Sequence, residues 1–271
     1  MYKRILTIQD ISCVGQCSMT IALPVLSACG HETCILPTAM LSTHTGGFQK
    51  PAVFQLAHAI PEIREHWLRE NITFDAIYTG YLGSTEAVRE TEEIARQLLN
   101  PGGTLIVDPA MADHGKLYSG FDNQYRDAMK RLCSKADMIL PNITEASMLA
   151  DLPYEEILTE DYVERLLCRM DHPCVVLTGV GFNEEETGIA VCCQGKHFEY
   201  RHKKFPQSYH GTGDLFAACF TGTFLRGKDL CDAATIAADT VCLSISNTAE
   251  NPAHWYGVKF ETAIPYLISK L

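Results

Sequence analysis

The chain has 271 residues, of which 46% are hydrophobic and 20% are charged, a composition typical of globular proteins with a substantial core. Its formal net charge of −11, without a basic stripe, argues against nucleic-acid binding, which requires clustered lysine and arginine. No stretch is apolar and long enough to span a bilayer, so we expect no membrane partner.

Short β-branched segments alternate with amphipathic segments along most of the chain. We expect strands at Arg4–Gln9, Thr33–Leu36, Ala76–Thr79, Thr104–Val107, Met138–Leu140 and Cys174–Thr178. We expect helices between them at Cys17–Ala28, Ala52–Arg69, Thr85–Leu99, Gln124–Cys133 and Asp161–Met170. This alternation predicts an α/β protein, a three-layer α/β/α sandwich with a mostly parallel central sheet.

The last third of the chain has a different pattern. The segments Thr187–Cys193 and Lys196–Arg201 predict an antiparallel hairpin, and only helices are expected after it, at Leu215–Leu225, Cys231–Thr248 and Phe260–Lys270. No repeat or linker divides the chain, so we expect a single domain over residues 1–271. The first residues lack the apolar segment of a signal peptide, and we expect a cytoplasmic protein.

Twelve cysteines raise the question of disulfides or a metal site. There is no C-x-x-C pair, and most of the cysteines lie in apolar runs, so they are expected to be reduced and to act as small hydrophobes. A zinc site is a less favoured alternative. Its candidate ligands are close in the sequence: Cys13, Cys17, Cys29, His31 and Cys34.

The most informative segment is Gly211-Thr212-Gly213-Asp214, which precedes an apolar run. The start of a helix presents unpaired N–H groups and the positive end of the dipole to an anion, and glycine allows close approach. A carboxylate beside bound phosphate is unfavourable unless it has a task such as taking a proton. The pattern therefore suggests phosphoryl transfer, and the alternative is an ordinary helix start capped by Thr212 or Asp214.

Polar residues follow each predicted strand. They are Gln9-Asp10-Ile11-Ser12, the segment 42–47, Thr79-Gly80-Tyr81, the segment 108–113, the segment 141–145 and Thr178-Gly179. Ligands of open parallel sheets bind at the carboxyl ends of the strands. We therefore expect these residues and the 211–214 turn to lie along one rim, which favours the phosphate interpretation over simple capping.

The chain resembles the pyridoxal kinases of the ribokinase-like superfamily. Five motifs, in order, carry the resemblance: Ser42-Thr43-His44-Thr45, Thr79-Gly80-Tyr81-Leu82-Gly83-Ser84, Val107-Asp108-Pro109, Pro141-Asn142-x-x-Glu145 and Gly211-Thr212-Gly213-Asp214. The resemblance implies ATP-dependent phosphorylation of the 5′-hydroxyl of pyridoxal, pyridoxamine or pyridoxine. It also implies a homodimer.

The resemblance gives roles to the residues around the phosphates. Asp214 would be the base that takes the hydroxyl proton, and the N–H groups of Gly211, Thr212 and Gly213 would form an anion hole. Four further residues around the phosphates are expected at the ATP site: Asp108, Asp113, Asn142 and Glu145. Asp108 and Glu145 would gather Mg²⁺ near the nucleotide, with Asn142 supporting Glu145. Asn142 and Glu145 could also form a helix cap, and both roles can coexist.

Other residues are assigned to the two substrates. Thr178 and Gly179 would contact ATP, or they form an ordinary strand end with a glycine turn. Ser12, Thr45 and Gly46 would bind the substituents of the pyridine ring, and Tyr81 would pack against the ring. His44 belongs to the same site, where a structural hydrogen-bonding role is favoured over direct contact. The segment 41–50 is a candidate flap that excludes water.

One departure from the family leaves a question open. Pyridoxal kinases often have threonine before the Pro-Asn pair, where this chain has Leu140, which puts a monovalent site for K⁺ in doubt. The nearest rival function is that of a hydroxymethylpyrimidine kinase, although those enzymes typically carry cysteine at the position of Asp214. A catalytically inactive sensor of B6 vitamers or nucleotides is the alternative from another class.

Overall fold

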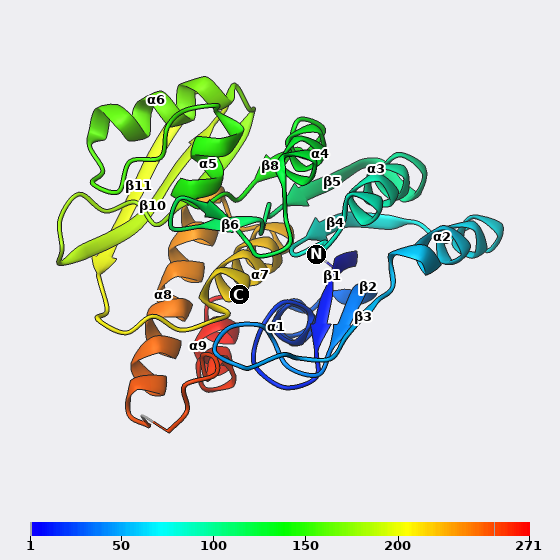
Figure 1. Ribbon diagram of the computed structural model, residues 1–271, viewed down its shortest axis with the longest axis horizontal. Coiled ribbons are helices and arrows are strands. Elements are labelled where there is room, and N and C mark those ends of the chain that lie inside the picture. The colour runs from blue at the N-terminus through cyan, green and yellow to red at the C-terminus, as the bar shows by residue number, and fades with distance from the viewer. Residues whose placement is uncertain (1, 252) are drawn as a thin grey trace.

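The computed structural model describes residues 2–251 and 253–271 (Figure 1). The described residues form a sheet with the strand order β11-β10-β9-β8-β5-β4-β1-β2-β3. Its strands are β1 (Arg4–Ser12), β2 (Glu32–Leu41), β3 (Val53–Gln55), β4 (Phe74–Thr79), β5 (Leu99–Val107), β8 (Met138–Ile139), β9 (Cys174–Thr178), β10 (Glu186–Cys193) and β11 (Lys196–Lys203). The pairings from β2 through β1, β4, β5 and β8 to β9 are parallel, and β3, β10 and β11 add antiparallel edges.

Helices cover both faces of this sheet (Figure 1). One face carries α1 (Met19–Ala28), α7 (Thr212–Arg226), α8 (Leu230–Ala249), the 3-10 turn η2 (Phe260–Ala263) and α9 (Ile264–Ser269). The other carries α2 (Ile60–Arg69), α3 (Thr85–Leu98), α4 (Asn123–Cys133), α5 (Ile143–Leu149) and α6 (Glu160–Met170). Side chains alternate between the two cores along each strand, so Leu6 and Ile8 face one core while Ile5 faces the other. The predicted three-layer sandwich is confirmed.

The predicted helix at Ala52–Arg69 is wrong over its first residues. Val53–Gln55 forms β3, which pairs antiparallel with the end of β2, and the 3-10 turn η1 (Ala57–Ala59) follows. Helix α2 begins only at Ile60, with Pro61 in its first turn, where proline is favoured. The pairing of β3 depends on backbone groups of β2, which the local periodicity of the sequence does not report.

Several short elements near the strand ends were not predicted. The hairpin of β6 (Ala112–Asp113) and β7 (Lys116–Leu117) follows β5, and the seven-residue α5 follows β8, where only its start had been considered, as a cap at Asn142 and Glu145. The expected helix Phe260–Lys270 is divided into η2 and α9, because Pro265 stands in the first turn of α9. These elements are too short to show a clear period in the sequence.

The cysteines are free thiols, of which four are buried, six are half-buried and two are exposed. Within residues 2–251 and 253–271, no three His, Cys, Asp or Glu side chains converge to hold a metal by themselves. The same residues contain no helix of the length and apolarity needed to cross a bilayer.

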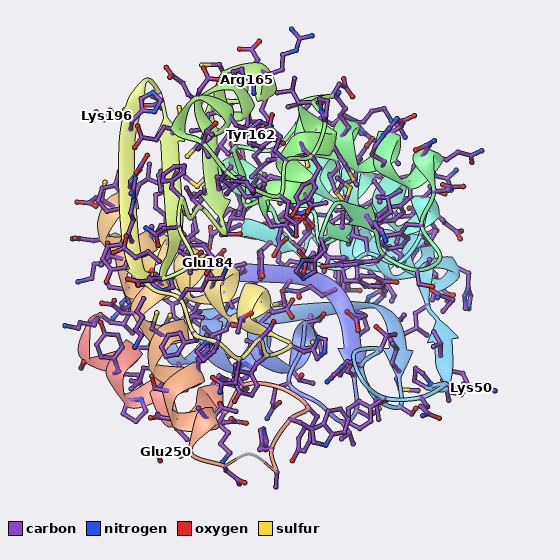
Figure 2. All side chains as sticks on the ribbon, turned by 60° about the vertical axis from the view of Figure 1, so that its left-hand side comes forward. Lys50, Tyr162, Arg165, Glu184, Lys196 and Glu250 are labelled. Atoms are coloured by element: carbon purple, nitrogen blue, oxygen red, sulfur yellow. The ribbon has the colours of Figure 1, made fainter. Side chains whose placement is uncertain are left out.

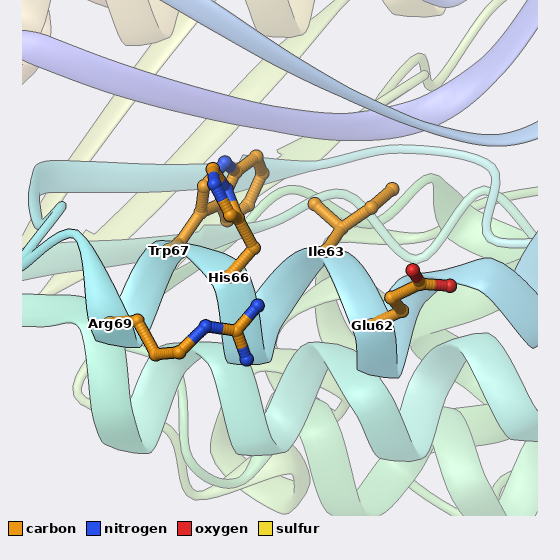
Figure 3. Close-up of a pocket in the computed structure, with 5 residues that line it drawn as sticks. All are labelled: Glu62, Ile63, His66, Trp67 and Arg69. Carbon is orange, nitrogen blue, oxygen red and sulfur yellow. The ribbon is translucent and has the colours of Figure 1, made fainter.

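Two surface hollows lie away from the carboxyl ends of the strands. One is lined by side chains of α2, which are Glu62, Ile63, His66, Trp67 and Arg69 (Figure 3). Trp67 also borders the second hollow, together with residues at the starts of β1, β2 and β4 such as Arg4, Glu32 and Phe74. The starts of these parallel strands are the opposite edge of the sheet from the predicted rim.

Candidate active site

The N-terminus of α7 has the open geometry of an anion site. Its N-cap is Gly211, at φ 84, and no side chain caps the helix. The alternative in which Thr212 or Asp214 caps α7 is therefore wrong, and the Thr212 hydroxyl instead donates to the carbonyl of Tyr209 at 3.2 Å. The first N–H groups of the helix thus have no side-chain partner and are available to a ligand.

The two glycines of this turn serve different purposes. A Cβ on Gly211 would lie 2.1 Å from the carbonyl oxygen of Gln16, so only glycine fits against the loop before α1. A Cβ on Gly213 would meet nothing within 4 Å. Gly213 therefore faces open space, where the lack of a side chain lets a bound group approach the backbone.

Asp214 lies in the first turn of α7 and faces the start of α1. Burial raises the pKa of Asp214 above its usual range, and hydrogen bonding from the backbone of Ser18 and the thiol of Cys17 opposes that rise by favouring the charged form. Asp214 is thus a carboxylate held in a fixed position next to the free N–H groups of α7.

Glu145 ties the turn before α5 to the segment after β5. It is 2% exposed, and its carboxylate accepts N–H groups from Met111 at 2.8 Å, Ala112 at 3.4 Å and Asn142 at 3.0 Å. The Asn142 side chain accepts the N–H of Glu145 at 2.9 Å, which completes a capping box. The predicted cap is confirmed, and Asn142 supports Glu145 through these bonds.

The carboxylate of Asp108 lies within the electrostatic influence of Glu145 and Asp214. Burial, then the charges of Glu145 and Asp214, raise the pKa of Asp108 well above its usual range. Burial also raises the pKa of Glu145 to about 7. Among the ion pairs of the described residues, none joins these three carboxylates to lysine or arginine. This excess of negative charge would favour a cation.

The other predicted nucleotide residues lie around this group. Asp113 is exposed at the tip of the β6–β7 hairpin, where its carboxylate accepts the N–H of His114 at 2.8 Å. Its negative charge adds to the rise in the pKa of Glu145. Thr178 ends β9 and pairs with Asn142 in an isolated parallel bridge. Gly179 lies in the exposed turn that follows. The structure therefore brings the ends of β5, β8 and β9 together.

The loop after β2 is held by an aromatic cluster of His44, Phe48, His210, Trp255 and Tyr256. Phe48 contacts Trp255 at a centroid distance of 4.8 Å and His44 at 5.0 Å, and His44 lies 5.1 Å from His210. Figure 2 shows Lys50, on this loop, and Glu250, at the end of α8, both toward the lower side of the view.

His44 has a structural role in this loop. It is 4% exposed, its Nδ1 accepts the N–H of Gly46 at 3.0 Å, and its Nε2 lies 2.7 Å from the carbonyl oxygen of Tyr256. Both polar atoms of the ring are therefore engaged within the protein. Thr45 is exposed beside it, and a Cβ on Gly46 would lie 2.2 Å from the His210 ring, so Gly46 packs against the residue that precedes the 211–214 turn.

The residues at the ends of β1 and β4 border the remaining side of the site. The Tyr81 ring stacks on Phe121 at 5.2 Å, and its carbonyl accepts the N–H of Asp10 at 3.1 Å. Ser12 has no exposed surface, and its hydroxyl donates to Asp10 at 3.4 Å. Ser12 is therefore not on the surface of the site. This geometry does not favour direct contact of its side chain with the pyridine ring of a substrate.

Sequence reasoning placed Asp10 along the rim without giving it a role, and it missed Cys17 and Ser18 as site residues. Asp10 is only 5% exposed, and its carboxylate accepts the hydroxyl of Ser12 at 3.4 Å. Burial raises its pKa to about 6, and the nearby charge of Asp214 adds to the rise. A carboxylate at the end of the first parallel strand was the available signal, because that position belongs to the ligand-binding edge.

The family assignment follows from comparison with known proteins. A family profile described as phosphomethylpyrimidine kinase matches residues 23–258. The chain belongs to this family. The pyridoxal kinase of Arabidopsis thaliana is 27% identical over 270 residues, covering 92% of this chain and 83% of the plant protein. The hydroxymethylpyrimidine/phosphomethylpyrimidine kinase of Haemophilus influenzae is 27% identical over 177 residues, covering 62% of this chain and 64% of that enzyme.

Solved structures share the whole fold. Pyridoxal kinase from Lactobacillus plantarum matches with a TM-score of 0.90 and 33% identity, covering 98% of this chain and 97% of that chain. A candidate phosphomethylpyrimidine kinase from Bacteroides thetaiotaomicron, solved with pyridoxal, matches with a TM-score of 0.91 and 31% identity, covering 98% and 95%. The resemblance to the pyridoxal kinases of the ribokinase-like superfamily is confirmed, and the chain is a kinase of the family that joins pyridoxal and phosphomethylpyrimidine kinases.

Proposed function

We propose that this kinase is a pyridoxal kinase, which transfers the γ-phosphoryl group of ATP to the 5′-hydroxyl of pyridoxal, pyridoxamine or pyridoxine. The observation that carries the proposal is the placement of Asp214. Its carboxylate, whose charged form Ser18 and Cys17 favour, adjoins an uncapped helix start where Gly213 faces open space. A base and an anion-binding backbone at one turn are the two elements that phosphorylation of an alcohol requires.

The proposed reaction is an in-line displacement. The vitamin's hydroxyl oxygen forms a bond to the γ-phosphorus, the bond from that phosphorus to the β–γ bridging oxygen breaks, and ADP leaves. Asp214 takes the hydroxyl proton, which demands little of a carboxylate when proton transfer comes late in a loose transition state. The N–H groups of Gly211, Thr212 and Gly213 hold the phosphoryl oxygens during the transfer.

A divalent cation fits the acidic end of the site, and Mg²⁺ is the one we propose. Asp108 uses Oδ1 to accept the N–H of Ala110 at 3.1 Å, and the charges of Glu145 and Asp214 add to the rise in its pKa that burial causes. Mg²⁺ usually binds one or two carboxylates together with waters and substrate phosphates, which suits a site without three converging protein ligands. When bound, it would neutralise phosphate charge. Asp108 is the proposed direct ligand of the cation. Glu145 already accepts three N–H groups, and we propose that it lies beside the cation and adds negative charge there.

The monovalent site stays an open proposal. Leu140 is buried in the core that also contains α7, and it offers no side-chain oxygen where related pyridoxal kinases often have a threonine hydroxyl. Thr178, Gly179 and Asp113 would lie along the nucleotide. Thr45, Gly46 and Tyr81 would contact the vitamin, while His44 and Ser12 would position the loop and Asp10.

Two alternatives can be separated by one assay. The H. influenzae relative favours a hydroxymethylpyrimidine kinase. The B. thetaiotaomicron structure with pyridoxal and the carboxylate at position 214 favour a pyridoxal kinase. Purified protein would be incubated with Mg-ATP and either pyridoxal or hydroxymethylpyrimidine, and the phosphorylated product measured. Product from pyridoxal alone supports the proposal, product from the pyrimidine alone refutes it, and binding of both without product identifies a sensor.

The assembly and location of the protein are further proposals. We propose a cytoplasmic homodimer with one domain per chain. Large apolar side chains are exposed together on the β2–β3 edge: Ile35, Met40, Val53 and Phe54. An edge strand with exposed apolar side chains is a surface prone to pairing with another chain, and this edge is where we expect the second copy.

A further inference from the structure

Two cysteines stand directly opposite each other on neighbouring antiparallel strands. Cys174 begins β9, Cys193 ends β10, and the register of the two strands makes them partners. The turn after Cys193 leads to Lys196, the first residue of β11, which Figure 2 labels. These strands form the edge of the sheet opposite the β2–β3 edge, so the surface proposed for the dimer does not include them.

The two cysteines occupy the closer of the two kinds of position in an antiparallel ladder. The N–H of Gln194 donates to the carbonyl of Pro173 at 3.0 Å, so the hydrogen-bonded position lies one residue beyond the cysteines. Cys174 and Cys193 therefore form a non-hydrogen-bonded pair, for which the two Cα atoms lie about 4.5 Å apart. A disulfide requires Cα atoms within about 7 Å of each other. The backbone spacing is thus compatible with a bond between the two sulfur atoms.

Both side chains lie on the same face of the sheet. Cys174 is a member of the core that contains α7 and α8, and Cys193 packs against that core. The nearby Cys193 thiol adds to the rise in the pKa of Cys174 that burial causes. Cys192 instead packs against the opposite core, across from Val175, with its Sγ 3.7 Å from Nε2 of His197. Cys192 therefore lies on the wrong face to replace Cys193.

The two thiols differ in their access to solvent. Cys174 is 3% exposed, whereas Cys193 is half-buried. A small oxidant can therefore reach Cys193 first, and Cys174 lies opposite it as a second thiol. An accessible cysteine next to a resolving cysteine is the arrangement of many reversible redox sites.

We propose that Cys174 and Cys193 form a reversible oxidation site, at which a hydroperoxide converts the two thiols into a cross-strand disulfide that fastens β10 to β9. The Cys193 sulfur attacks a peroxide oxygen, the O–O bond breaks, and a sulfenic acid and an alcohol or water form. The Cys174 sulfur then attacks the sulfenic sulfur, and the hydroxyl group leaves with the Cys174 proton as water. Both sulfurs are oxidised, and the hydroperoxide is reduced.

The spacing of the pair also makes the bond easy to reverse. A Cα separation of about 4.5 Å is at the short end of the range for disulfides, and strained disulfides are reduced more readily. We therefore expect a thiol such as glutathione to restore both cysteines. While it lasts, the bond closes residues 174–193 into a loop, and a closed loop has fewer conformations available.

The test is to treat the full chain with stepwise amounts of hydrogen peroxide and to map disulfides by mass spectrometry without reduction. Trypsin and a glutamate-specific protease separate the candidates, because Arg169 lies between Cys168 and Cys174, and residues 184–186 are glutamates between Cys174 and Cys193. We expect a linked pair of peptides, about 2 Da lighter than the two free peptides together because two hydrogen atoms are lost. Glutathione should separate them again.

Two variants assign the bond to one of the adjacent cysteines. The linked peptides should be absent in Cys193→Ala and unchanged in Cys192→Ala, the matched control that removes the neighbouring thiol on the other face. Should Cys193→Ala fail to fold, Cys193→Ser, which keeps a polar group of similar size, gives the same comparison. In the oxidised wild type we also expect slower amide hydrogen exchange in residues 186–203.

The result that would overturn the proposal is the absence of the link between residues 174 and 193, whether the thiols stay reduced, Cys193 becomes a sulfinic acid, or Cys168 pairs with Cys192. Unchanged hydrogen exchange in a protein that does form the link would also overturn it, because the bond would then fasten nothing. None of these measurements uses kinase activity. An inactive wild type would therefore refute the proposed function without affecting this test.

Discussion

The Nε2 atom of His44 lies 2.7 Å from the carbonyl oxygen of Tyr256, although the two residues are 212 positions apart in the sequence. This contact ties the loop after β2 to the segment before η2, across the space in front of α7. The aromatic cluster reinforces it through Phe48 and Trp255. The proposed flap is therefore fastened at one identifiable point.

Loss of this contact should loosen the flap. In His44→Ala we expect faster amide hydrogen exchange in residues 42–50 and a higher KM for pyridoxal, because the loop loses both hydrogen bonds of the ring and its contact with Phe48. Exchange measured by mass spectrometry, with and without substrate, checks this. His197→Ala, on the distant β11, is the control, and unchanged exchange in His44→Ala would count against the flap.

Removal of the carboxylate at position 214 should separate catalysis from stability. We expect Asp214→Asn to bind pyridoxal and to lose turnover by about a hundredfold or more, with a nearly unchanged melting temperature. The matched control is Asp229→Ala, since Asp229 is a true N-cap that accepts the N–H of Asp232 at 2.8 Å. That variant should lose about 1 kcal/mol of unfolding free energy and keep its rate. A fast Asp214→Asn enzyme would show that the base lies elsewhere.

The two glycines of the turn should respond in opposite ways to alanine. In Gly213→Ala the fold should hold or gain about 0.5–1 kcal/mol of unfolding free energy, because alanine favours the helix, while kcat falls since the methyl group enters the phosphate space. In Gly211→Ala the new Cβ would collide with the Gln16 carbonyl, so thermal stability should fall. Equal rates for Gly213→Ala and wild type would argue against phosphate at this turn.

The acidic cluster predicts a pH-dependent response to metal. Burial raises the pKa of Glu145 from 4.5 to about 7, so its contribution to the stability of the metal-free fold is present below its unfolded pKa and is lost as pH rises through about 7. Mg²⁺ binds the ionised carboxylates, and its stabilising effect should grow with pH.

We therefore expect Mg²⁺ to raise the melting temperature more at pH 8 than at pH 5.5, measured by calorimetry before and after chelation. Asp108→Asn should abolish most of this difference. Asp122→Asn, on the exposed turn before α4, should leave it intact. A Mg²⁺ effect that is the same at both pH values would contradict the assignment.

The β2–β3 edge gives a direct test of the dimer. In Phe54→Glu we expect light scattering to report a monomer, because a charge replaces an exposed apolar side chain on the edge strand. The control is Ile157→Glu, which changes another exposed apolar residue in the loop before α6. A dimer that survives Phe54→Glu would place the interface elsewhere.

The sequence by itself determined the class of fold and singled out the glycine-rich turn at residues 211–214. Strand and helix periods are local properties, so the α/β sandwich could be read from alternating segments. Gly211 and Asp214 could be recognised because a glycine-rich helix start presents free N–H groups that suit an anion, and this pattern is local. The cap of Asn142 and Glu145 was likewise readable, since its two partners are three residues apart.

Only the tertiary structure decided how the residues of the rim divide their tasks. β3 exists only because the edge of β2 offers it backbone partners, and the left-handed backbone of Ser18 before α1 is not signalled by its residue type. His44 meets the carbonyl oxygen of Tyr256 only because the fold brings these two distant residues together. These are contacts between residues distant in sequence, and their geometry is set by the packing of layers, which no local pattern encodes.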